Sequence, residues 1–171
     1  MHPSIYNVTR FSMYLPVAAG MLCALCLVGG CTGAPLPARL GELSLVREIS
    51  GDAGQQMIDR LHGKGVTPRE SFIGFYEGEG SRATLYVSGY DDPNDALDVD
   101  RKMAGRIRAG NAVFGGYRER NIDGQQVSEC VGMQQVHFFF SSGNSLYWLG
   151  VDPPIAWGTL ISLLDGVGGG G

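Results

Sequence analysis

LYVSGYDDP, residues 85–93, predicts a β-strand that leads directly into an α-helix. Apolar and polar side chains alternate along residues 83–88, as expected for a strand with one buried face. Asp92 then provides an N-cap, and Pro93 occupies the first helical position, where its missing N–H costs nothing. The helix should end at Gly110. Its apolar stripe is Ala96, Val99, Met103 and Ile107.

A second stretch, LYWLGVDPP at residues 146–154, matches the first one in register at Leu, Tyr, Gly, Asp and Pro. It also leads from a predicted strand into a predicted helix. The match favours an internal duplication, with two helix–strand–strand units that share one antiparallel sheet. Convergence is the alternative, because Asp followed by Pro is a general way to open a helix after a strand.

The apolar patterns in the rest of the sequence predict further helices and strands. Together they indicate an α+β fold class, with an antiparallel sheet and the helices packed on one face. We expect this α+β domain to span residues 52–165, followed by a flexible Gly-rich tail at residues 166–171. The other predicted helices cover residues 52–62 and 152–164, and the other predicted strands cover residues 72–76, 113–118, 126–131, 134–141 and 146–151.

The N-terminal segment is apolar and ends in Leu27-Val28-Gly29-Gly30-Cys31, which resembles the lipobox of bacterial lipoproteins. The resemblance implies that residues 1–30 are a signal peptide, that cleavage precedes Cys31, and that the Cys31 thiol carries lipid. Residues 31–51 would then be the lipidated N-terminus and a tether. One alternative is an uncleaved membrane anchor, since residues 11–30 approach the length that spans a bilayer. The other alternative is a buried core helix.

The resemblance to bacterial lipoproteins also implies a location in the bacterial cell envelope, on the periplasmic or extracytoplasmic side of a membrane. The membrane would be one partner, through the lipid on Cys31, and an envelope protein is a candidate second partner. The net charge of −4 does not suggest binding to nucleic acid. The predicted layout resembles uncharacterised envelope proteins with repeated α+β units, a resemblance that carries over no activity.

Few residues suggest catalysis or metal binding. Cys23 and Cys26 have CxxC spacing but lie in the apolar leader, and the acidic stretch 91–100 fails the EF-hand pattern. No cofactor, metal site or catalytic residue is therefore expected. Cys130 is left without a disulfide partner and is either a small buried residue or, as an alternative, a nucleophile activated by His137.

Aromatic residues are concentrated on two adjacent predicted strands. Phe138, Phe139 and Phe140 place rings on both faces of one strand, and Tyr147 and Trp148 do so on the next. If helices cover only one face, Phe139, Tyr147 or Trp148 should form a partner surface. The sequence therefore favours a non-enzymatic binding or assembly module. A small envelope enzyme using Cys130 and His137, or a carrier of lipid or another small ligand, are the alternatives.

The lipobox hypothesis predicts the fate of the N-terminus. Cys31→Ala should leave an unprocessed precursor, because the thiol that accepts the lipid is lost. The intact mass of the membrane-extracted protein measures this. A wild-type protein that still carries residues 1–30 would instead indicate a transmembrane anchor.

Overall fold

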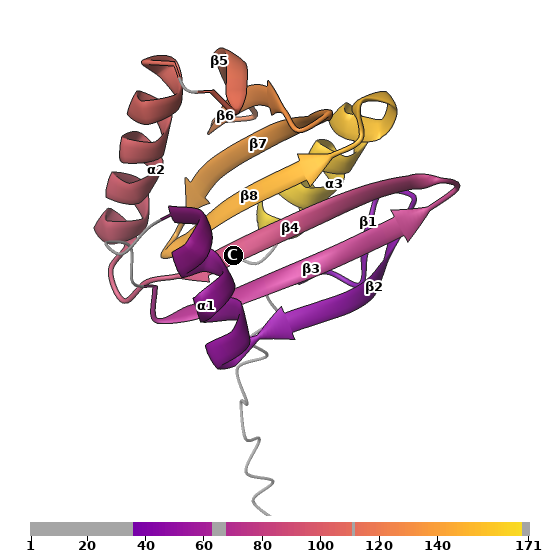
Figure 1. Cartoon of the computed structure of the whole chain (residues 1–171), viewed down its shortest axis with the longest axis horizontal. Helices are drawn as coiled ribbons and strands as arrows, with labels where there is room; N and C mark the ends of the chain where they lie inside the picture. The colour runs from indigo at the N-terminus through magenta and orange to yellow at the C-terminus, as the bar shows by residue number, and fades with distance from the viewer. Residues whose placement is uncertain (1–35, 63–67, 111, 169–171) are drawn as a thin grey trace, which may run out of the picture. The chain divides into compact units, whose positions relative to one another are not determined.

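In the part of the chain that the structure describes, eight antiparallel strands form one sheet in the order β1-β2-β3-β4-β8-β7-β6-β5, accompanied by three α-helices (Figure 1). This computed structural model describes residues 36–62, 68–110 and 112–168. The strands are β1 (Arg39–Leu40), β2 (Leu43–Ser50), β3 (Glu70–Gly78), β4 (Ser81–Gly89), β5 (Phe114–Ile122), β6 (Gln125–Gly132), β7 (Gln135–Ser142) and β8 (Ser145–Val151). The helices are α1 (Gly51–His62), α2 (Pro93–Arg108) and α3 (Ala156–Gly168), with a short 3₁₀ turn, η1 (Pro153–Ile155), before α3.

The two faces of the sheet are covered by different helices. On what we call the α2 face, Phe139 packs with the buried side of α2, and Ser71 in β3 forms a 3.0 Å hydrogen bond with Gln55 of α1. On the opposite, α3 face, Phe138 and Phe140 pack with the buried side of α3. In Figure 1, α1 crosses in front of the sheet and α3 lies behind it.

The antiparallel sheet and the α+β class are thus confirmed, whereas the prediction that all helices pack on one face is wrong. The reason lies in the rings of β7, which point alternately to the two sides of the sheet. The middle of this strand, His137 to Phe140, is buried on both faces, so each face needs its own helical cover.

The chain joins the sheet earlier than the predicted boundary at residue 52. β1 and β2 pair with each other, and β2 pairs with β3. Leu36, Leu40 and Leu43 are buried in the core on the α3 face. Residues 36–50, predicted as part of a tether, therefore belong to the folded domain. At the other end, α3 continues to Gly168, into the predicted tail.

Cys31 and the predicted leader lie outside the residues that the structure describes. Within the described ranges, no helix is both long enough and apolar enough to cross a bilayer.

The two similar stretches lie on neighbouring strands, β4 and β8, but their matching residues point to opposite faces. Leu85 packs on the α3 face, whereas its counterpart Leu146 packs on the α2 face. One hairpin, β3–β4, follows α1, and four strands follow α2. The pairing does not reveal two equivalent units, and the duplication stays a prediction.

Helix α2, predicted from its cap and its apolar stripe, is stabilised by side-chain hydrogen bonds at its start and in its middle, and by burial of one face. The Asp92 carboxylate accepts a 2.8 Å hydrogen bond from the backbone N–H of Asn94, which confirms the predicted cap. One face of the helix buries Ala96, Met103 and Ile107, as the apolar stripe predicts. Further along, Asp100 accepts hydrogen bonds from the backbone N–H and the hydroxyl of Ser141 at the end of β7.

Removal of the α2 cap should destabilise the domain. Asp92→Ala should lower the free energy of unfolding by about 1 kcal/mol, because the N–H of Asn94 loses its acceptor. Urea denaturation measures the change. Asp98→Ala is the matched control, since this exposed carboxylate lies on the same helix beyond the cap. Equal effects of the two substitutions would contradict the assignment of the cap.

Candidate functional site

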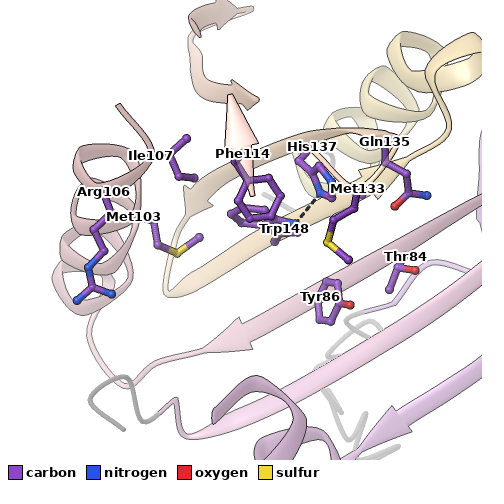
Figure 2. Close-up of a pocket in the computed structure, with 11 residues that line it drawn as sticks. Thr84, Tyr86, Met103, Arg106, Ile107, Phe114, Met133, Gln135, His137 and Trp148 are labelled. Atoms are coloured by element: carbon purple, nitrogen blue, oxygen red, sulfur yellow. Dashed lines mark hydrogen bonds between the residues drawn. The ribbon is translucent and has the colours of Figure 1, made fainter. Parts of the chain in front are cut away.

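A pocket of about 290 Å³ opens on the α2 face, between α2 and the strands β4, β8 and β7. Figure 2 shows the α2 side chains on one side, Phe114 and Trp148 in the middle, and the β6–β7 turn on the other side. Most of its lining is apolar. The lining residues are Thr84, Tyr86, Met103, Arg106, Ile107, Phe114, Met133, Gln135, His137, Trp148 and Gly150.

Trp148 is fixed by ring contacts on the floor of this pocket. It stacks on Phe139 with 5.0 Å between ring centroids and an interplanar angle of 8°. The ring of Phe114 meets it edge-on at 5.3 Å and meets His137 edge-on at 5.0 Å. Tyr86 is the register partner of Trp148 on β4 and is also half-buried. These contacts hold the indole in one orientation beside the open space.

Two glycines make room for this arrangement of rings. A Cβ at Gly150 would lie 3.1 Å from Nδ1 of His137, its cross-strand neighbour. A Cβ at Gly132 would lie 2.5 Å from Cδ1 of Phe114. A side chain at either position would therefore displace a ring that lines the pocket.

His137 is held as a neutral imidazole. The indole N–H of Trp148 donates to His137 Nδ1 at 3.1 Å, and His137 Nε2 lies 3.0 Å from the carbonyl oxygen of Gly132. An indole N–H only donates, so Nδ1 carries no proton and Nε2 donates to the carbonyl. Burial lowers the pKa of His137, and the contact with the Gly132 carbonyl opposes this shift more weakly.

The β6–β7 turn at the mouth of the pocket is strained. Met133 and Gln134 have φ values of +52° and +64°, a left-handed conformation that is costly for residues other than glycine. The other two-residue turns in this sheet place glycine at one of their central positions, as in Asp123-Gly124. The strained turn presents Met133 to the pocket with 74% of its surface exposed. Backbone strain of this kind is concentrated at functional sites such as ligand clamps.

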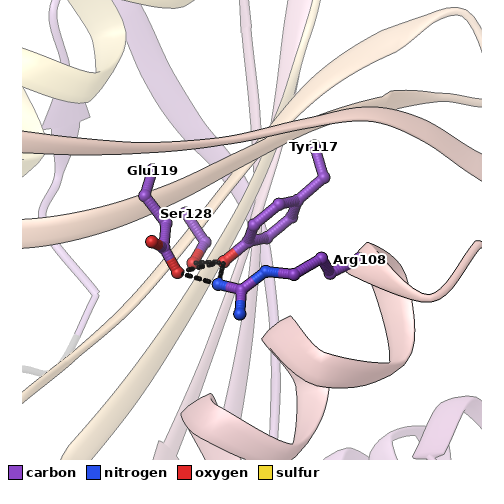
Figure 3. A network of polar contacts seen from close by, with 4 residues as sticks. All are labelled: Arg108, Tyr117, Glu119 and Ser128. Atoms are coloured by element: carbon purple, nitrogen blue, oxygen red, sulfur yellow. Dashed lines mark hydrogen bonds and ion pairs between the residues drawn. The ribbon is translucent and has the colours of Figure 1, made fainter.

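A polar network fastens the edge strand β5 to the end of α2 (Figure 3). Arg108 forms an ion pair with Glu119 and a 3.3 Å hydrogen bond to the hydroxyl of Tyr117. That hydroxyl lies 2.8 Å from Glu119 and 3.1 Å from the hydroxyl of Ser128 in β6. By tying β5 to α2 and β6, this network supports the strand that carries Phe114 over the pocket.

The three predicted partner residues do not form one surface. Phe139 is fully buried beneath the pocket, so it cannot contact a partner directly. Trp148 is half-buried and lines the pocket on the α2 face. Tyr147 points to the α3 face, where it stacks on Phe140 at 5.0 Å. Only Trp148 is positioned as the partner-surface hypothesis requires.

Cys130 and His137 are cross-strand neighbours on β6 and β7, but they do not form an activated nucleophile. The Cys130 thiol is fully buried, and burial together with the charge of Glu129 raises its pKa to about 11. Both nitrogens of His137 are already hydrogen-bonded to other groups. In the part of the chain that the structure describes, no cluster of three or more His, Cys, Asp or Glu side chains is arranged to hold a metal ion.

The sequence matches no protein-family model, no curated protein and no solved structure. The sequence pattern pointed to Trp148 as a functional residue but not to the pocket residues Arg106, Phe114 and Met133. An apolar residue in a two-residue turn without glycine was the available signal for Met133.

The buried neutral state of His137 should make stability depend on pH. Its pKa is lower in the folded protein, so the unfolded chain binds the proton first as pH falls below about 6.5. The free energy of unfolding should therefore fall between pH 7.5 and pH 5.5. His137→Gln should flatten this fall, measured by urea denaturation at both pH values. The other two histidines are present in both proteins, and equal slopes would contradict the neutral assignment.

Proposed function

We propose that the protein is a lipid-anchored binding module of the bacterial cell envelope, held at the membrane through Cys31. Its pocket on the α2 face would receive a large apolar side chain from a polypeptide partner. The anchor rests on the resemblance of residues 27–31 to a lipobox. The observation that carries the binding role is an open, mostly apolar pocket whose rings are held in place before any ligand arrives. A site organised in advance loses less conformational entropy on binding.

The size and surroundings of the pocket favour a side chain of a larger partner. A volume of about 290 Å³ is at the lower end for small-molecule sites and suits one ring better than a whole lipid. Apolar surface also extends beyond the pocket. Met133 at the mouth of the pocket is 74% exposed, and Val113, which precedes the pocket residue Phe114 in the chain, is 53% exposed. A partner that fills the pocket would cover this surface too.

The enzyme alternative loses support from the same region. A nucleophilic cysteine needs an accessible thiolate and a base with a free nitrogen. Cys130 is buried with a raised pKa, and His137 is committed to Gly132 and Trp148.

Fluorescence of Trp148 tests the proposal in the full chain. Trp157→Phe leaves Trp148 as the only tryptophan, and residue 157 lies half-exposed on α3. The peptide Ac-Gly-Phe-Gly-NH2 should change the emission saturably, whereas Ac-Gly-Ala-Gly-NH2 should not. Met133→Ala should weaken binding about fivefold through the loss of roughly 1 kcal/mol of apolar contact.

Val46→Ala is the matched control for Met133→Ala, because Val46 is an exposed apolar residue on β2 that does not line the pocket. It should leave binding unchanged. The absence of saturable binding by the Phe peptide, or equal binding of the Ala peptide, would overturn the proposed function.

A further inference from the structure

Arg106 is the one charged residue among those that line the pocket. It extends from the last turns of α2 and is exposed, and it forms no ion pair with any residue that the structure describes. Arg108, two residues further along α2, is by contrast paired with Glu119. The cation beside the apolar walls is therefore available to a ligand.

A second cation reinforces the first. Lys102 lies one turn before Arg106, and residues four apart share one side of a helix. Asp98 and Lys102 have the i,i+4 spacing of a helical ion pair, but no such pair forms among the described residues. Two like charges at this spacing destabilise a helix slightly. Lys102 and Arg106 are thus neighbouring positive charges on a protein whose net charge is −4. The packing of the pocket itself does not require a cation.

We infer that the partner segment carries a carboxylate next to the apolar residue that enters the pocket, and that Arg106 pairs with this carboxylate. The inference rests on the proposed function and adds the charge of the partner to it. The surrounding apolar groups exclude water from part of the contact, so the ion pair is stronger than one on an open surface. Lys102 adds attraction at longer range.

Two kinds of residue supply this chemistry in a polypeptide. One is a C-terminal aromatic residue, whose own carboxylate is the anion, and the other is an acidic side chain beside an internal aromatic residue. Ac-Gly-Gly-Phe with a free carboxylate represents the first, and Ac-Gly-Glu-Phe-Gly-NH2 represents the second. Ac-Gly-Gln-Phe-Gly-NH2 is the neutral reference for both.

The test is titration of the full-chain Trp157→Phe protein with the three peptides, followed by Trp148 fluorescence. At least one acidic peptide should bind about fivefold or more tightly than the neutral peptide. Arg106→Gln should abolish this preference while leaving the neutral peptide bound. Arg101→Gln removes the same charge from the same helix outside the pocket lining, and it should retain the preference. A high salt concentration should reduce the preference.

The outcomes separate this inference from the proposed function. Equal binding of acidic and neutral peptides overturns the charge inference and leaves the apolar pocket intact. The same holds if Arg101→Gln reduces the preference as much as Arg106→Gln, because the effect is then one of net charge. Loss of binding by all three peptides overturns the proposed function itself.

Discussion

The pairing of β4 with β8 is the contact on which the rest of the structure depends. It runs from Ala83 opposite Val151 to Gly89 opposite Ser145, and it joins the N-terminal strands to the four-strand meander β5–β8. Because side chains alternate along each strand, this register places Leu85 and Leu149 in the core on the α3 face. The same register places Tyr86 opposite Trp148 on the α2 face, where the pocket forms.

The sequence predicted those helices and strands whose ends are set by a few neighbouring residues. Asp92 and Pro93 start α2 as expected, because capping and a fixed proline φ act within one turn. Strand β2 and the two-residue β1 were not predicted. Much of β2 is exposed, so its sequence lacks a regular apolar alternation, and its place is set by pairing with β3. Helix positions relative to the sheet also depended on distant contacts.

The candidate site was less predictable because it depends on register between distant strands. Side-chain alternation along a single strand is enough to indicate that His137 shares a face with Phe139, as it does on β7. It did not indicate that Phe114 would lie against His137, since their contact requires the β5–β6–β7 pairing and the space left by Gly132 and Gly150. Arg106 looked like an ordinary charge favoured near a helix C-terminus, and its functional interpretation depends on the pocket beside it.

Methyl NMR of the methionines tests the location of binding most directly. The chain has six methionines; Met103 and Met133 line the pocket, whereas Met57 lies on α1 outside its lining. With 13C-labelled methionine methyl groups, addition of a Phe-containing peptide should shift the signals of Met103 and Met133 through the ring current of the bound side chain. The Met57 signal should stay in place. Saturable binding that leaves Met103 and Met133 unshifted would contradict the account.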